Sequence, residues 1–211
     1  ITGFITNGPE LVCLVVGLIA GELLFAASTP LGSNLINPIL LILAALIHRV
    51  FLKTFQTKWK YSLVCILSTI GLAVSFYAIH SHYHLYWLVT ASLLTVFLFI
   101  KRPEEEIEND DDGKTEGLNS LWTIIPAGGV LITAGYFLDP IVTFASVQSL
   151  APKGAIGFFI LASLSSWPEF KTCLAFMSRQ KYQAAFLNIT VSNITNIWLA
   201  ILGISTYLIF S

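Results

Sequence analysis

The chain has 211 residues, of which 55% are hydrophobic and only 11% are charged. In soluble domains about a quarter of the residues are charged, so this chain has too few charged side chains to cover a surface that faces water. A soluble globular domain is therefore excluded. The charges nearly cancel, to a formal −1 at pH 7, and no basic stripe is present, so nucleic acid is not expected as a partner.

Apolar runs separated by short polar segments predict an all-α integral membrane protein with about seven transmembrane helices, because about 20 apolar residues cross a hydrocarbon core of about 30 Å. The spans are predicted near residues 1–20, 23–47, 60–80, 84–100, 120–148, 153–177 and 182–210. The first span is short on its N-terminal side, and the chain begins at Ile1 rather than Met. We therefore expect this sequence to be a piece of a longer protein.

The acidic residues are concentrated in one polar stretch. Eight of the twelve lie between Glu104 and Glu116, where the absence of apolar periodicity indicates a solvated linker. Only four acids lie elsewhere in the chain, and they are Glu10, Glu22, Asp139 and Glu169. A carboxylate inside an apolar span is costly and usually functional. Asp139, which precedes Pro140, is expected to be solvated near an outer helix end.

Lysine and arginine predict the orientation of the chain. If the seven spans alternate, Lys153 lies alone on one side, Lys171 lies within a span, and nine basic residues share the other side. The nine are Arg49, Lys53, Lys58, Lys60, Lys101, Arg102, Lys114, Arg179 and Lys181. Basic residues are typical of cytoplasmic loops, so the acidic loop 101–118 is predicted to be cytoplasmic.

The chain contains an internal repeat at an offset of 159 residues. At this offset Thr6–Glu10 aligns with Ser165–Glu169, and Ser33–Asn37 aligns with Ser192–Asn196. In both copies the serine follows the glutamate by 23 residues. The copies are five spans apart, an odd number, so the second enters the membrane in the opposite direction. Inverted-topology repeats are typical of secondary transporters, which bind substrate near the midplane between the repeats.

Within each copy, polar residues four positions apart lie on one helix face. The pairs are Thr6 and Glu10, Ser33 and Asn37, Ser165 and Glu169, and Ser192 and Asn196. Pro9 and Pro168 each remove a backbone N–H and are expected to kink the helix beside the acid, which frees the carbonyls of Ile5 and Leu164. Carboxylate, hydroxyl, amide and carbonyl oxygens suit Ca²⁺ or Na⁺ rather than a soft metal.

These motifs resemble the two alpha repeats of the sodium/calcium exchangers, members of the cation/Ca²⁺ antiporter superfamily. The resemblance is carried by Pro-Glu followed by Ser-Asn-x-x-Asn in each copy, and it covers roughly residues 1–40 and 150–200. The family motif Gly-Thr-Ser-x-Pro-Glu is altered here, since Thr-Ser becomes Thr6-Asn7 or Ser165-Ser166. The family has about ten spans, so the first gating helix and the last two would lie outside this sequence.

The resemblance also implies the site residues. Glu10 and Glu169 would be the Ca²⁺ carboxylates, and the other motif positions would supply further oxygen ligands. Those positions are Thr6, Asn7, Ser33, Asn37, Ser165, Ser166, Ser192 and Asn196. Some members place an acid at the position of Asn37 or Asn196, and an aspartate there is linked to K⁺ co-transport. The amides in this chain therefore argue against K⁺ dependence.

The sequence thus predicts a secondary active antiporter that exchanges Ca²⁺ for Na⁺ by alternating access. Two buried carboxylates cannot stay both empty and ionised, so the site holds one divalent ion or a charge-matched set of monovalent ions or protons. The alternatives are an H⁺-coupled Ca²⁺/cation exchanger, and a non-transporting membrane scaffold or incomplete exchanger half. The expected partners are Ca²⁺, a monovalent counter-ion and the lipid bilayer, with no cofactor beyond the transported ions; the oligomeric state is left open.

An enzyme is not expected. The chain has no Gly-x-Ser-x-Gly motif, and its histidines lie in loops or at span ends, so none lies deep in the membrane to act as a base for an intramembrane hydrolase. Two other features have alternative interpretations. Lys171 either tunes the site or faces elsewhere. His80, His82 and His84 form either an outer metal site or, as we favour, part of an interfacial belt with neighbouring aromatic residues.

We expect five segments along the chain. They are the first alpha repeat at 1–47, connecting membrane helices at 48–100, the acidic cytoplasmic loop at 101–118, a membrane helix leading the second half at 119–151, and the second alpha repeat at 152–211.

Overall fold

The computed structural model describes residues 6–56, 59–102 and 119–210, and all regular structure in these ranges is helical. The elements are α2 (Gly8–Ile19), α3 (Leu23–Ile47), α4 (Phe51–Gln56), α5 (Trp59–Ala78), the 3₁₀ turn η1 (Ser81–Tyr83), α6 (His84–Ile100), α7 (Asn119–Ser149), α8 (Lys153–Ala155), the π-helix η2 (Ile156–Leu161), α9 (Ala162–Ser165), α10 (Trp167–Ser178) and α11 (Tyr182–Phe210). Most of the acidic loop, residues 103–118, lies outside the described ranges.

The described part of the chain has four helical segments long and apolar enough to cross a membrane, namely Leu23–Ile47, Lys60–Ala78, Ser81–Ile100 and Tyr182–Phe210. A fifth is formed if Thr133–Ser149 and Lys153–Ser178, which meet at 110°, are counted as one bent span. Helix α2 is apolar but has only 12 residues. The all-α membrane fold is therefore confirmed, and the count of seven spans stays a prediction.

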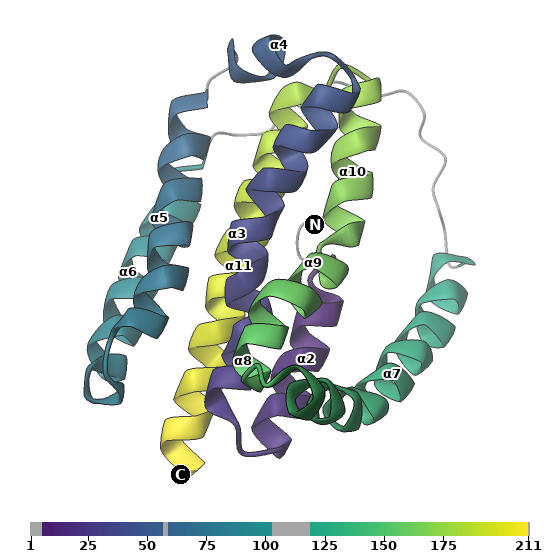
Figure 1. Cartoon of the computed structure of the whole chain (residues 1–211). Helices are drawn as coiled ribbons and strands as arrows, with labels where there is room; N and C mark the ends of the chain where they lie inside the picture. The colour runs from purple at the N-terminus through teal and green to yellow at the C-terminus, as the bar shows by residue number, and fades with distance from the viewer. Residues whose placement is uncertain (1–5, 57–58, 103–118, 211) are drawn as a thin grey trace.

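Helices α3 and α11 form the centre of the bundle and run side by side in opposite directions (Figure 1). Helices α2 and α10 pack against this pair, and each begins near the middle of the bundle. From there α2 runs toward the end where the C-terminus lies, and α10 runs toward the opposite end (Figure 1). The two copies of the repeat are thus inverted relative to each other, as their spacing along the chain predicts.

The other helices flank this core. Helices α5 and α6 form a pair against α3 and α11 on one side, and α7 packs along α2 on the other (Figure 1). Buried apolar residues from α3, α5, α6 and α11 form one cluster, in which Phe76 and Trp87 are the largest side chains. The core pair is therefore surrounded on several sides, which shields its polar residues from lipid.

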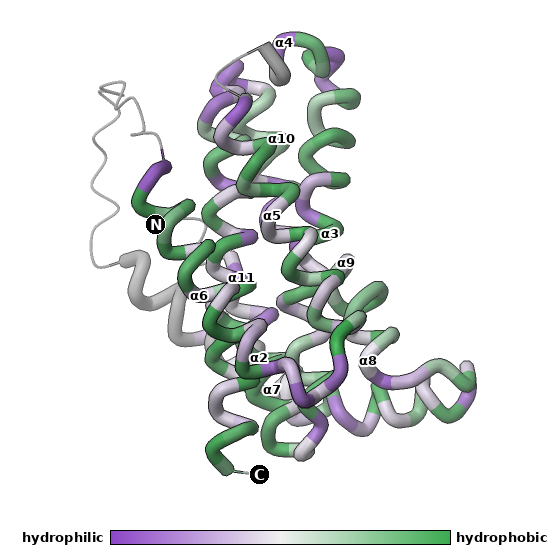
Figure 2. Tube along the Cα trace, turned by 90° about the vertical axis from the view of Figure 1, so that its left-hand side faces the viewer, coloured by the Kyte–Doolittle hydropathy of each residue, from purple (hydrophilic) through white to green (hydrophobic). Residues whose placement is uncertain are grey.

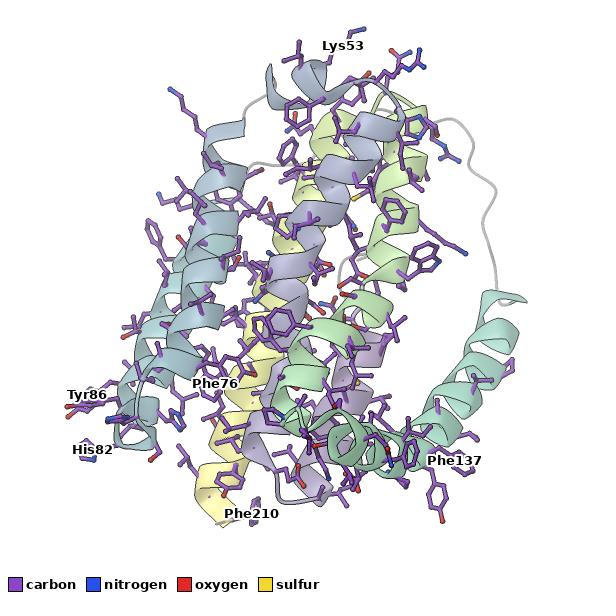
Figure 3. All side chains as sticks on the ribbon, in the orientation of Figure 1. Lys53, Phe76, His82, Tyr86, Phe137 and Phe210 are labelled. Atoms are coloured by element: carbon purple, nitrogen blue, oxygen red, sulfur yellow. The ribbon has the colours of Figure 1, made fainter. Side chains whose placement is uncertain are left out.

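The basic segments gather at one end of the bundle. Helix α4 and the turn between α10 and α11 lie there, and hydrophilic residues are concentrated around α4 (Figures 1 and 2). Lys53 is labelled at this end, and His82 at the opposite end (Figure 3). This arrangement agrees with the predicted charge asymmetry, while the cytoplasmic location of that end stays a prediction.

Thiol labelling tests this orientation. Lys53 and His82 are both exposed, whereas Cys13, Cys65 and Cys173 are all buried and give little background. We expect a membrane-impermeant maleimide to label Lys53→Cys only from the cytoplasmic side and His82→Cys only from outside. Labelling of both variants from the same face would contradict the topology.

Candidate ion-binding site

Both glutamates lie in the first turn of a half-helix. Glu10 lies in α2, which follows Asn7, and Glu169 lies in α10, which follows Ser166. The two preceding residues have nearly the same backbone conformation, with φ −84° and ψ 13° at Asn7 and φ −77° and ψ 5° at Ser166. Each carbonyl accepts the first helical hydrogen bond at 3.1 Å, from Leu11 or Phe170. The two copies of the repeat thus share their backbone conformation and first helical hydrogen bond at this position.

The proline of each motif lies within the first turn of its half-helix. In the second copy a single turn residue, Ser166, separates α9, which ends at Ser165, from α10, which begins at Trp167, so the helix is interrupted beside the acid. Proline is tolerated in a first turn because the N–H that it lacks would have no helical partner there. The first turns of α2 and α10, with the partial positive charge of a helix N-terminus, therefore lie at the carboxylates.

The Glu10 carboxylate is fully buried and accepts two hydroxyl hydrogen bonds. Ser33 donates to Glu10 Oε1 at 2.9 Å, and Ser165 donates to the same oxygen at 2.8 Å. Ser33 comes from α3 of the first copy and Ser165 from α9 of the second. The two hydroxyl oxygens lie 3.4 Å apart. Glu10 therefore connects the two repeats at the centre of the bundle.

Glu169 occupies the equivalent place in the second copy and is also fully buried. Ser192 Oγ lies at hydrogen-bond distance, 3.2 Å, from Glu169 Oε1, as Ser33 does from Glu10. Thr6 lies beside Glu169, as Ser165 lies beside Glu10. Residues that are related by the 159-residue offset thus make equivalent contacts in the two copies. These contacts bring together the carboxylates and hydroxyls of both motifs.

Amide side chains link the copies on the Glu169 side. Asn7 Nδ2 donates to the Ser192 carbonyl at 3.2 Å, and Ser192 Oγ donates to Asn7 Oδ1 at 2.8 Å. Asn37 Nδ2 donates to Ser192 Oγ at 3.3 Å and to Asn193 Oδ1 at 3.0 Å. Asn193 Nδ2 in turn donates to the Asn34 carbonyl, at 3.2 Å. These bonds hold α11 against α3 and against the start of α2.

Many buried oxygens of this region have no hydrogen-bond partner among the described residues. Glu10 Oε2 and Glu169 Oε2 are two of them. At other predicted positions they are Thr6 Oγ1, Asn37 Oδ1, Ser166 Oγ and Asn196 Oδ1. A buried polar atom without a partner is costly. A cation in contact with these oxygens would satisfy them without needing any further hydrogen, and oxygen-only ligation suits Ca²⁺ and Na⁺.

The sequence analysis missed several polar residues that belong to this region. Asn193 also donates to Thr69 Oγ1 of α5 at 3.2 Å, so α5 is tied to the core by a hydrogen bond. Thr29 and Asn188 are buried, each has an unpartnered polar atom within the described residues, and each lies four residues before the motif serine. The 159-residue offset relates these two positions and could have identified them.

The remaining candidates lie away from the carboxylates. Lys171 is exposed, so it faces elsewhere. His84 is buried and stacks on Phe76, whereas His82 is exposed, and the described residues hold no group of three His, Cys, Asp or Glu side chains that could hold a metal ion. The outer metal site is therefore not supported, and the belt interpretation is favoured.

Asp139 is ion-paired and not simply solvated. Lys153 Nζ lies 2.9 Å from Asp139 Oδ1 and 2.9 Å from Glu22 Oε1. The pairs join α7, the start of α8 and the residue before α3. The sequence could not predict the contact with Glu22, which lies 131 residues from Lys153 along the chain.

Comparison with known proteins finds a family match for the second half of the chain. The family described as "Sodium/calcium exchanger protein" matches residues 120–210, which include α10, α11 and the second copy of the motif. The first copy lies outside the match and is related to the second by the internal repeat. Neither the search of curated proteins nor the search of solved structures found a match. The second half of the chain, which contains Glu169 and Ser192, is therefore similar to the sodium/calcium exchanger family.

Proposed function

We propose that this chain carries the ion-binding core of a secondary active antiporter, which exchanges Ca²⁺ for Na⁺ across a membrane by alternating access. Members of the family that matches the second half are transporters rather than enzymes, and the long apolar helices support an integral, multi-pass membrane protein. The observation that carries the proposal is the pair of buried, repeat-related carboxylates, each with one oxygen at hydrogen-bond distance from a serine and one oxygen without a partner among the described residues.

The negative charge of the two buried glutamates explains why the site would bind cations. Two carboxylates removed from water are unstable unless positive charge accompanies them. One Ca²⁺ ion, or two Na⁺ ions, neutralises both. Because the same carboxylates bind either kind of ion, Ca²⁺ and Na⁺ cannot occupy the site together. If the site opens to each side of the membrane in turn, this competition produces exchange.

The proposed ligands are the two glutamates and the hydroxyl and amide oxygens around them. Ser33 and Ser165 already lie 2.9 Å and 2.8 Å from Glu10, and Ser192 lies 3.2 Å from Glu169. The further ligands proposed are Thr6, Asn37, Ser166 and Asn196, whose buried oxygens have no partner in the described part of the chain.

The test is Ca²⁺ flux in proteoliposomes made with the full-length protein. A Na⁺ gradient and a pH gradient are imposed separately, with Ca²⁺ uptake as the readout. Uptake driven by the Na⁺ gradient alone supports the proposal. Uptake driven only by the pH gradient would establish the H⁺-coupled exchanger instead, and absence of flux under both gradients would favour a non-transporting scaffold.

A charge change at Asn196 tests the second motif. Asn196 is fully buried and neither of its side-chain polar atoms has a partner among the described residues. Asn196→Asp adds a carboxylate, so the occupied site needs one more positive charge. We expect Ca²⁺ uptake by this variant to acquire a severalfold dependence on K⁺ or on a higher Na⁺ concentration.

The matched variant is Asn37→Ser at the equivalent position. It removes an amide that donates to Asn193 but leaves the charge unchanged. We expect weaker uptake with the parent's dependence on monovalent ions. If Asn196→Asp behaves like the parent under every monovalent condition, Asn196 does not contact the ions.

A further inference from the structure

The two halves of the site differ at one position of the motif. Asn7 and Ser166 are repeat-equivalent and precede equivalent half-helices. Asn7 makes two hydrogen bonds to Ser192, one to its carbonyl at 3.2 Å and one from its hydroxyl at 2.8 Å. Ser166 Oγ has no partner among the described residues. Asn7 of the first copy is therefore hydrogen-bonded to Ser192 of the second copy, whereas Ser166 makes no equivalent bond within the described residues.

This contact decides where the Ser192 hydrogen points. One hydroxyl carries one hydrogen, and Ser192 Oγ lies 2.8 Å from Asn7 Oδ1 but 3.2 Å from Glu169 Oε1. The bond from Asn7 Nδ2 to the Ser192 carbonyl fixes the amide so that Oδ1 faces the hydroxyl. The hydrogen therefore goes to Asn7. In the other half Ser33 donates its hydrogen to Glu10, at 2.9 Å.

The consequence for a cation is direct. With its hydrogen on Asn7, Ser192 Oγ turns a lone pair toward Glu169 Oε1, and the two acceptor oxygens stand 3.2 Å apart. Oxygens that share one Ca²⁺ ion, each at about 2.3–2.6 Å from it, lie about 3 Å from each other. On the Glu10 side, in contrast, Oε1 accepts hydrogens from both Ser33 and Ser165, so a cation that binds this oxygen must displace them.

We propose that Asn7 is a positioning residue that acts through Ser192: it keeps the Ser192 hydrogen off Glu169 and thereby prepares the Glu169–Ser192 edge to bind the divalent cation. This inference rests on the proposed function and revises the sequence-based assignment of Asn7 as a direct ligand. Both polar atoms of the Asn7 side chain are hydrogen-bonded to Ser192, so the amide positions the Ser192 hydroxyl and does not contact the ion itself.

The test is equilibrium Ca²⁺ binding to the purified full chain by calorimetry at low Na⁺, arranged as a double-mutant cycle. Asn7→Ser introduces the residue that the second copy has at this position, so the half-helix keeps a good N-terminal residue. Released from Asn7, the Ser192 hydrogen moves to Glu169. We expect the Kd for Ca²⁺ to rise about tenfold, the effect of one hydrogen bond to a charged group. Asn7→Ala is expected to give the same result.

The cycle separates positioning from direct ligation. In a Ser192→Ala background no hydroxyl is left to move, so Asn7→Ser is expected to change the Kd less than about twofold. The same tenfold loss in both backgrounds would show that Asn7 binds the ion itself and would overturn the inference while leaving the proposed function intact. Absence of Ca²⁺ binding by the parent chain would overturn both. Size-exclusion profiles of the variants show that binding is compared between folded proteins.

Discussion

Glu10→Gln and Glu169→Gln are each expected to abolish Ca²⁺ transport while the protein stays folded. Both side chains are fully buried in the centre of the bundle. Glutamine keeps the size of the side chain and one acceptor oxygen but removes a negative charge. In a low-dielectric site a divalent ion then lacks half of its compensating charge, which costs several kcal/mol. The measurement is Ca²⁺ uptake in proteoliposomes. A loss of about 3 kcal/mol in binding free energy corresponds to a fall in uptake of at least 100-fold.

The matched control is Glu22→Gln, the same chemical change outside the site. The Glu22 side chain is 40% exposed and pairs with Lys153 at 2.9 Å. An ion pair of this exposure contributes little to stability, so transport by this variant is expected to stay near the parent level. Retained uptake in either Glu10→Gln or Glu169→Gln would remove the carboxylate pair from the mechanism.

Gly32→Ala is expected to destabilise the fold more than other small substitutions. A Cβ atom at Gly32 would lie 2.1 Å from the carbonyl oxygen of Phe158 and 2.8 Å from the Cβ of Ala162. Close helix contacts at small residues are typical of membrane proteins. Since α3 cannot keep this approach to η2 and α9 with a methyl group between them, the overpacking should cost about 1–3 kcal/mol.

The measurement is thermal unfolding in detergent, where this cost corresponds to a fall in Tm of several degrees. Because Ser33 follows Gly32 directly, a drop in Ca²⁺ affinity is also expected. Gly71→Ala is the matched control, since a Cβ there meets no atom within 4 Å. Equal Tm values for the two variants would contradict the described packing of α3 against η2.

The sequence predicted the helices of the core closely. The apolar runs at 23–47 and 182–210 correspond to α3 and α11, residue for residue. Polar residues at which the chain turns lie on both sides of α3 and just before α11, so composition alone marks these ends. The internal repeat was equally informative, because it identified the two glutamates and two serines that the fold then brings into contact.

Other features depend on tertiary contacts that a linear pattern does not contain. The π-helix at Ile156–Leu161 lies in an apolar segment, so nothing in its composition marks it, whereas Pro168 does mark the interruption before Trp167. The bond between Asn7 and Ser192 joins residues 185 positions apart. The repeat predicts which residues are equivalent, but it does not predict which of two equivalent residues forms a contact.

The central claim is that Glu10 and Glu169 together bind Ca²⁺ in competition with Na⁺. The most direct measurement is the binding of radioactive Ca²⁺ to the purified full chain at increasing Na⁺, compared with the variant carrying both Glu10→Gln and Glu169→Gln. We predict saturable binding by the parent that Na⁺ displaces, and no saturable binding by the double variant. Equal Ca²⁺ binding by the two proteins, or binding that Na⁺ does not affect, would contradict the account.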